Sequence, residues 1–527
     1  MHRLSALKPD IISGFLVFLI ALPLCLGISL ASGFPPTGGL ITAIVGGMLV
    51  SLLGSAKLTI KGPAAGLIVV VIGAVTELGG GTVGYKRTLA IGVVAGILQI
   101  ILALVRSGVI GELMPSSVVH GMLAAIGVII IAKQSHVAMG VKPEGKEPLH
   151  LLAEIPQSLS KLNPEVFFIG IVALLILFGL PMIKSQWARK VPGQMVVMAV
   201  AIPLGLLFDL EHEHTYNFAN HLYHLSPDFL IRLPASMLSA IAFPDFSMIT
   251  SAVSIKYIVM FALVGTIESL LTVSAVDSID PEKGTSDLNR DLLATGIGNT
   301  IAAAIGGLPM ISEVVRSKAN LDAGAKSRWS NFFHGAFLLA ALMFIPGLLQ
   351  EIPLAALAGM LIYTGFRLAS PKEFVHVYKI GPEQLLLFCT TLIITLATDL
   401  LIGVGVGLML KLLLHLIHGA PVRSLFKAIV QEDRQGDTLV LRVHDSAIFT
   451  NFLGLKNRLA SIPDGVRKVV VDFENAWVVD HTVLEKMHRI GAQWADRELV
   501  LQGFDNHKAW SNHELAARRR VTRAGAL

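Results

Sequence analysis

The chain has 527 residues, long enough for two or three soluble domains, but its composition excludes that organisation. Hydrophobic residues make up 53% and charged residues only 15% of the chain, whereas soluble domains carry about 25% charge. The mean hydropathy is +0.69. This composition excludes a soluble enzyme, a disordered protein and a disulfide scaffold. The two cysteines, Cys25 and Cys389, lie in apolar segments, so the sequence does not imply a disulfide bond between them.

Apolar segments follow one another up to about residue 420. The first, residues 11–32, is uncharged and would span about 33 Å as a helix, which matches the hydrocarbon core of a bilayer. We expect Pro23 to interrupt this helix. About fourteen segments are predicted, at residues 11–32, 37–54, 64–77, 88–105, 116–132, 165–182, 192–208, 255–275, 291–305, 312–320, 332–349, 353–366, 383–398 and 400–418.

Two of these segments are too short to cross a bilayer as helices. Residues 64–77 follow Lys61-Gly62-Pro63, and residues 312–320 follow a Gly-Gly-Leu-Pro stretch at 306–309. Each is the third segment of its half of the chain, and short, Gly/Pro-interrupted segments at matching positions indicate a transporter site at the membrane midplane. An odd number of spans per half predicts two inverted repeats; the alternative is two unrelated re-entrant loops.

The short segments predict an anion site, because a half-helix that begins inside the membrane presents free N–H groups and a partial positive charge. The residues at the two openings are Ala64, Ala65, Gly66, Ser312, Glu313 and Val314. In an inverted repeat these openings face each other, which favours a small anionic substrate. Arg316 lies one turn into the second half-helix and is a functional candidate by its depth; alternatively, it pairs with Glu313.

Glu268 is the other charge within the apolar sequence. A buried carboxylate must take up a proton, hold a cation or find a positive partner. Thr272 follows one helical turn later on the same face. The pair predicts coupling to Na⁺ or H⁺, and the structural alternative is an ion pair between Glu268 and Arg316. His120 and His136 are weaker candidates for a proton relay, and residues 211–214 (Glu-His-Glu-His) are a weak metal signal.

Lysine and arginine predict the orientation by the positive-inside rule. With the N-terminus inside, the inner loops are richer in cations than the outer loops, which places both termini in the cytoplasm. The inner cations include Lys8, Arg106, Arg189, Lys190, Lys283, Arg328, Arg367 and Arg423. This excess of cations in the inner loops explains the basic pI without a nucleic-acid partner. We expect membrane lipid to surround the protein, and we expect no cofactor besides the coupling ion.

Charged residues become more than twice as dense after about residue 423, so we predict a membrane domain at 1–423 and a soluble domain at 424–527. Strands are expected at 438–450, 468–473 and 498–503, and helices at 452–460 and from Asp480, a plausible N-cap, to about Trp494. This alternation predicts a small α/β domain. Without a nucleophile–base pair or a phosphate-binding loop, regulation or assembly is expected rather than catalysis.

These motifs together resemble the SulP (sulfate permease) family of anion transporters, with a STAS domain at the C-terminus. The resemblance rests on Ala21-Leu22-Pro23-Leu24 with residues 31–36, on residues 268–272, on residues 308–320 with Arg316, and on residues 469–473 followed by Asp480-His481-Thr482. It implies a seven-plus-seven inverted repeat with core and gate domains, elevator-type alternating access and a homodimer.

The chain departs from the family pattern at two positions. Glu313 stands where many members have a small residue, so an extra carboxylate lies near the predicted anion site. The expected regulatory loop consists of Asp480, His481 and Thr482. His481 stands where related STAS domains have a serine that can be phosphorylated, which puts a phosphorylation switch in this loop in doubt.

The sequence is interpreted as a cation-coupled importer of a small inorganic anion in the plasma (inner) membrane, with bicarbonate as the first substrate. Sulfate is the second choice and C4-dicarboxylates the third. Three other classes are weighed: a nucleobase–cation symporter, which would lack the STAS domain; a non-transporting sensor or scaffold, which would leave Glu268 and Arg316 unexplained; and, least favoured, a membrane enzyme.

Overall fold

The fold was analysed in a computed structural model of the chain, which describes residues 2–108, 113–145, 147–185, 191–233, 240–280, 284–425, 427–463, 465–494 and 496–521. The predicted inner-loop cations Arg189, Lys190 and Lys283 lie outside the described residues. The chain forms two compact units. The first comprises residues 1–108 and 126–369, and the second comprises residues 109–125 and 370–527.

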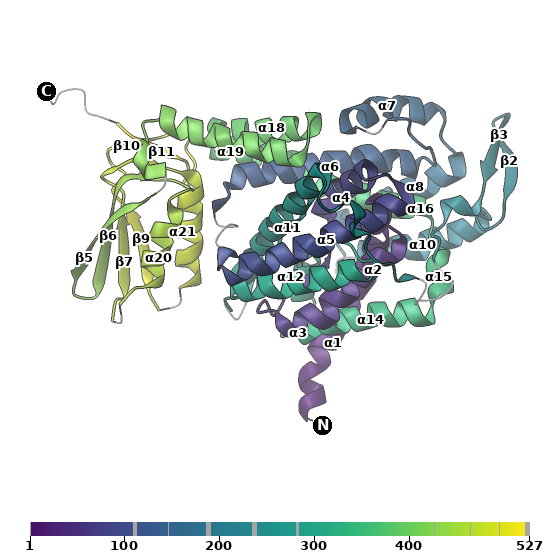
Figure 1. The fold of residues 1–527 in the computed structure, drawn as a ribbon, viewed down its shortest axis with the longest axis horizontal. Coiled ribbons are helices and arrows are strands. Elements are labelled where there is room, and N and C mark those ends of the chain that lie inside the picture. Colours follow the sequence, from purple (N-terminus) through teal and green to yellow (C-terminus); the bar gives the residue numbers. More distant parts are fainter. Residues whose placement is uncertain are drawn as a thin grey trace. The chain divides into compact units, whose positions relative to one another are not determined.

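The first unit is a bundle of helices (Figure 1). Its helices in the first half of the chain are α1 (His2–Ala31), α2 (Pro36–Val45), α3 (Ser51–Leu53), α4 (Ile68–Glu77), α5 (Gly81–Leu104), α7 (Pro148–Ser160), α8 (Pro164–Gly179) and α10 (Gly193–Leu207). Those in the second half are α11 (Ala252–Ile279), α12 (Leu288–Ala304), α13 (Val314–Asp322), α14 (Trp329–Phe344), α15 (Pro346–Gln350) and α16 (Leu354–Leu368). Helix α6 (Ser116–Ala138) begins in the second unit and ends in the first.

Helices occupy every predicted apolar segment, and among the described residues eight are long and apolar enough to cross a membrane. The chain is thus a helical, multi-pass membrane protein, while the count of fourteen spans stays a prediction. The expected break at Pro23 is wrong, because α1 is one continuous helix with Pro23 inside it. A proline removes one backbone hydrogen bond from a helix, and membrane helices tolerate this loss because their surroundings satisfy the freed carbonyl.

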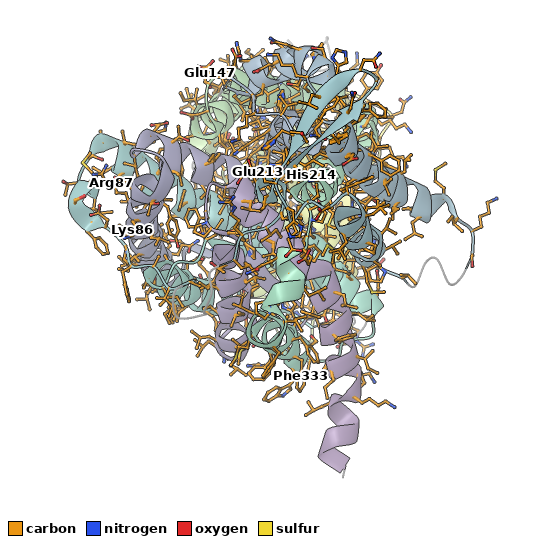
Figure 2. All side chains as sticks on the ribbon, turned by 90° about the vertical axis from the view of Figure 1, so that its right-hand side faces the viewer. Lys86, Arg87, Glu147, Glu213, His214 and Phe333 are labelled. Carbon is orange, nitrogen blue, oxygen red and sulfur yellow. The ribbon has the colours of Figure 1, made fainter. Side chains whose placement is uncertain are left out.

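Two features of the predicted outer loops were not expected. Helix α7 follows α6, and a hairpin of β2 (His214–Phe218) and β3 (His221–Leu225) lies within the loop that follows α10. Glu213 and His214 lie at the start of this hairpin (Figure 2). Among the described residues no group of histidine, cysteine and carboxylate side chains has the arrangement of a metal site.

The two short segments meet through a strand pair at the centre of the first unit. Strand β1 (Ile60–Pro63) precedes the 3₁₀ turn Ala65–Leu67 and α4, and strand β4 (Met310–Glu313) precedes α13. The strands are antiparallel, with Ile60 opposite Glu313 and Pro63 opposite Met310. The chain therefore enters its two half-helices from one ladder in opposite directions, as an inverted repeat requires.

The second unit joins α17 (Pro371–Ile380), α18 (Pro382–Ala397) and α19 (Leu400–Ile417) to a C-terminal α/β domain. The strands are β5 (Ile429–Gln435), β6 (Thr438–Ala447), β7 (Lys468–Asp472), β8 (Ala476–Val479), β9 (Glu498–Gln502), β10 (His507–Ala509) and β11 (Arg518–Arg520). Their order is β10-β11-β8-β6-β7-β9, and β5 pairs with β6. Helices α20 (Phe452–Ala460) and α21 (His481–Gln493) lie on one face of the sheet (Figure 1).

The α/β domain has its own hydrophobic core. Strands β6 and β7 contribute Leu441, Val443 and Val471, and the helices contribute Leu455 and Met487, all almost fully buried. The predicted α/β character of this region is confirmed, and the domain is consistent with a STAS domain. The boundary at residue 423 stays a prediction.

Candidate anion-binding site

The β1–β4 ladder places the beginnings of the two half-helices side by side. The backbone N–H of Ala64 donates to the carbonyl of Pro309 at 3.3 Å. Ala64 is the N-cap of the turn that leads into α4, and Glu313 is the N-cap of α13. Neither has a capping hydrogen bond from its side chain.

Arg316 is buried between the two half-helices with part of its hydrogen-bonding capacity unused. Only 1% of its side chain is exposed, and Nη1 donates to the sulfur of Cys25 at 3.4 Å. Nε and Nη2 are buried without a partner among the described residues. A Cβ added to Gly62 would collide with Nη1, so an arginine from the second half of the chain reaches the strand that leads into the first half-helix.

Glu268 lies at the same place from another direction. Its side chain in α11 is 7% exposed, and Oε1 has no hydrogen-bond partner among the described residues. Both carboxylate oxygens lie so close to Gly66 that a Cβ there would overlap them. Thr272, one turn later in α11, is 3% exposed. The ladder and α11 therefore bring Ala64, Ala65, Gly66, Ser312, Glu313, Arg316 and Glu268 together, whereas Val314 is half exposed.

The ion pairs that the sequence left open as alternatives are not formed. Among the described residues, no ion pair joins Arg316 to Glu313 or to Glu268. An unpaired buried charge is costly, and unsatisfied buried polar groups are rare in folded proteins. Each of these three side chains thus keeps at least one buried polar atom without a hydrogen-bond partner among the described residues.

A second buried charge cluster next to the site was missed by the sequence analysis. The ammonium group of Lys61 in β1 forms an ion pair with Asp291 of α12 and donates to Ser312 Oγ at 2.6 Å. The backbone N–H of Ser312 in turn donates to Ser269 Oγ at 3.2 Å. The available signal was a lysine immediately before Gly62-Pro63 in an apolar region, but its partner is more than two hundred residues away along the chain.

An amide side chain holds strand β4 in place. The N–H of Met310 donates to Oδ1 of Asn299 at 2.6 Å, and Nδ2 of Asn299 donates to the Met310 carbonyl at 3.2 Å. The same Nδ2 donates to Gln99 Oε1 at 2.7 Å. These bonds fix the strand that leads into α13, and so the position from which Arg316 extends.

A cavity of about 380 Å³ lies beside the second half-helix. It is lined by residues of α1, α8, α10, α13 and α16, including Ile20, Gln194, Val315 and Arg367. Val315 is the neighbour of Arg316 in the chain, and Arg367 supplies a cation to the lining. The cavity is large enough for a small hydrated anion next to the buried site.

In the second unit, the predicted regulatory loop is a buried ion-pair cluster. Asp480 is the N-cap residue of α21, as expected, but its side chain makes no capping hydrogen bond. Its carboxylate lies 2.7 Å from Lys411 Nζ and 3.6 Å from His415 Nε2, both in α19. Lys411 also lies 2.9 Å from Glu383 of α18.

This cluster explains the electrostatics of the loop. Burial by itself would raise the pKa of Asp480, but the charge of Lys411 and the imidazole of His415 outweigh it and hold that pKa below its usual range. His481 Nδ1 lies 2.7 Å from the carbonyl oxygen of Leu515, and Thr482 is fully buried. In this structure the loop contacts α19 through Asp480, and Lys411 of α19 links it to Glu383 of α18.

The first unit combines helical spans with two half-helices. A buried arginine and a buried carboxylate lie beside the N-termini of these half-helices, and this combination is typical of an anion transporter. The family model of the Sulfate permease family matches residues 7–391, and the chain belongs to this family. It is an anion transporter, not an enzyme.

Named relatives include both sulfate and bicarbonate transporters. YvdB of Bacillus subtilis, whose name provisionally describes it as a sulfate transporter, is 26% identical over 413 residues, covering 78% of this chain and 73% of YvdB. The bicarbonate transporter BicA of Picosynechococcus is 24% identical over 405 residues, covering 76% of this chain and 69% of BicA.

Solved structures share the fold. The transmembrane domain of a cyanobacterial bicarbonate transporter BicA matches with a TM-score of 0.66 at 21% identity, covering 76% of this chain and 97% of that domain. SLC26A9 matches with a TM-score of 0.65 at 14% identity, covering 94% of this chain and 84% of SLC26A9. At these identities the likeness concerns the fold alone.

Proposed function

We propose that this chain imports a small inorganic anion, bicarbonate in the first place, together with Na⁺ or H⁺. The observation that carries the proposal is the meeting of two half-helix N-termini with the unpaired guanidinium of Arg316. The anion binds there to backbone N–H groups of Ala65 and Gly66 and of the segment Ser312–Val314, and charge-assisted hydrogen bonds from Arg316 add to its affinity.

Bicarbonate is preferred to sulfate because of the charge of the site. The carboxylates of Glu268 and Glu313 face a single unpaired arginine, so a doubly charged anion is repelled more strongly than a singly charged one. The BicA relatives carry bicarbonate in their names, which agrees with this order. Sulfate, as in the name of YvdB, is the second candidate and a C4-dicarboxylate the third.

Glu268 is the proposed coupling residue. Its Oε1 is unpaired and its carboxylate lies against Gly66, at the start of the first half-helix. A cation held by Glu268 compensates its buried charge and lowers the repulsion felt by the anion, so the two bind together. Thr272 is close enough in the helix to add a second oxygen for Na⁺, which a proton does not need.

The remaining features of the proposal concern the whole transporter. We infer elevator-type alternating access between core and gate domains, a homodimer, and a plasma-membrane location with both termini in the cytoplasm. The cation-rich inner loops support this orientation. Asp480, His481 and Thr482 are proposed to link the α/β domain to the membrane helices and so to regulate assembly.

Uptake into liposomes tests the function. Purified full-length protein is reconstituted, and radiolabelled bicarbonate, sulfate and fumarate are offered separately under a Na⁺ gradient or a proton gradient. We expect accumulation of bicarbonate above its equilibrium level with one of the gradients. Accumulation of sulfate or fumarate alone would reject bicarbonate, and no accumulation of any anion would reject the function.

The coupling ion is identified by one substitution. Thr272→Val removes a hydroxyl that only Na⁺ uses, so we expect uptake driven by Na⁺ to fall several-fold and uptake driven by protons to be spared. Equal losses under both gradients would contradict a Na⁺ site at Thr272. Lys86→Ala, at an exposed position in α5 (Figure 2), is the control for handling of the variants.

A further inference from the structure

The start of the first half-helix, where the proposed function places the anion, already faces two carboxylates of the protein. Glu313 ends strand β4, which pairs with the strand that leads into this half-helix, and the carboxylate oxygens of Glu268 abut Gly66. Glu313 belongs to β4 and Glu268 to α11. One carboxylate oxygen of each glutamate is buried without a hydrogen-bond partner among the described residues.

The charges at this site do not balance. Arg316 is the one cation in contact with it that lacks an ion pair among the described residues, because the charge of Lys61 is compensated by Asp291. With both glutamates ionised, the site carries one positive and two negative side chains. An incoming monovalent anion brings the number of negative charges at the site to three. Arg316 compensates one of them and the cation at Glu268 a second, so one negative charge remains.

The remaining compensation must occur at Glu313. The titratable and charged groups that interact with Glu313 are Cys25 of α1, Glu268 of α11 and Arg316 of α13. His334 of α14 interacts with Arg316, and the Lys61–Asp291 pair of β1 and α12 lies at the neighbouring Ser312. A metal ion at Glu313 would need several oxygen ligands and would lie beside the Arg316 guanidinium. A proton needs only the carboxylate and leaves Arg316 free for the substrate.

We propose that Glu313 is a second coupling residue: it takes up a proton as the anion binds, so that Arg316 faces the anion without a competing carboxylate charge. The proton comes from the side on which the anion enters and leaves with it on the other side, so each transported anion carries one proton at Glu313 as well as the cation at Glu268. This inference rests on the proposed anion site and concerns a residue that distinguishes this chain from the usual pattern of small residues.

The pH dependence of uptake tests the proposal. Full-length protein in liposomes is assayed at constant Na⁺ between pH 6.5 and 8.5 with the anion that the wild type accumulates, bicarbonate or sulfate, and bicarbonate concentrations are corrected for pH. If binding takes up one proton at Glu313, the half-saturating concentration of the wild type rises tenfold for each pH unit above the pH at which Glu313 loses its proton. In Glu313→Gln the slope of its logarithm against pH falls by about one, and affinity at pH 8.5 rises.

The controls separate this proposal from the function itself. Glu313→Asp keeps a carboxylate and should retain the wild-type slope, and Glu313→Ser should behave as Glu313→Gln. An unchanged slope in folded Glu313→Gln overturns the proposal and leaves the anion site intact. If the wild type takes up neither anion, the proposed function fails and this inference fails with it.

A measurement on the wild type alone guards against variants that do not fold. A pH-indicator dye in weakly buffered detergent solution reports proton uptake when the transported anion is added at pH 8 with saturating Na⁺. About one proton per bound anion, after correction for the buffering of bicarbonate, supports the proposal, and no uptake overturns it.

Discussion

The two half-helices differ in chemistry although one ladder places both. The opening of the first is formed by Ala64, Ala65 and Gly66, and α4 after it is apolar. The second opens with Ser312 and Glu313, and Arg316, Ser317 and Asn320 are its buried residues. One half-helix thus presents bare backbone N–H groups, and the other brings charge.

This difference shows that an inverted repeat conserves geometry without conserving side chains. Small residues in the first half let Glu268 approach the backbone at Gly66, and charged residues in the second half reach across to Gly62. We therefore expect substitutions in the first half-helix to act through steric overlap, and substitutions of the charged residues to act through electrostatics. The predictions below test this distinction, in order of decreasing effect on transport.

The largest effect is expected for Glu268→Gln. The carboxylate is buried and unpaired, so its charge must be compensated when the transporter is loaded. The neutral amide removes that requirement, and accumulation along a cation gradient should be lost while counterflow exchange, which needs no driving force, persists. Wild-type accumulation by a folded Glu268→Gln protein would reject the coupling role, and Glu211→Gln, exposed in the loop after α10, is the control.

Arg316→Ala should lower anion affinity by about 10- to 100-fold. Hydrogen bonds to charged groups contribute about 1.5–3 kcal/mol, and Arg316 has two unused donors at the site. Arg316→Lys should retain part of the affinity, because the charge remains and the planar geometry is lost. Half-saturating concentrations are measured in liposomes, with exposed Lys318→Ala on the same half-helix as the control. An unchanged affinity in Arg316→Ala would refute the anion site.

Gly66→Ala tests the steric role of the first half-helix. The added methyl group would overlap the carboxylate of Glu268, and overpacking of this kind costs about 1–3 kcal/mol. We expect about a tenfold loss of affinity, and little further loss when Glu268 is already replaced by alanine, because the two positions share one contact. Gly179→Ala, where nothing lies within 4 Å of the added atom, should be neutral. Fully additive losses would show that the overlap is not the cause.

The charged part of the site could be predicted from the sequence because charge is rare in apolar segments. Glu268 and Arg316 were singled out in this way, and the two half-helix openings were predicted from their short, Gly/Pro-interrupted segments. The Lys61–Asp291 pair could not be predicted, since it joins residues 230 positions apart and depends on the packing of β1 against α12. For the same reason, the sequence did not reveal that Gly62 and Gly66 lie against charged side chains.

Local signals also misled where tertiary contacts override them. Asp480 precedes a helix, which is the usual position of a capping carboxylate, yet its side chain binds Lys411 instead. Lys411 lies in an apolar helix and needs a partner more than the helix needs a cap. The stronger electrostatic demand determines the orientation of the side chain.

Asp480→Asn should have the smallest effect on transport and a large effect on stability. Lys411 and Asp480 are both fully buried, and removal of one partner of such a pair costs about 3–5 kcal/mol; the contact of Lys411 with Glu383 favours the lower end. The anion site lies in the first unit, so the half-saturating concentration should stay within about twofold of the wild type while thermal unfolding shifts to lower temperature. The triple variant Lys411→Met/Asp480→Leu/Glu383→Gln removes all three charges of the cluster and should recover most of the lost stability, because neutral side chains need no compensating charge. A changed affinity in folded Asp480→Asn would instead show that this cluster communicates with the anion site, and the division between a transporting unit and an anchoring cluster would have to be abandoned.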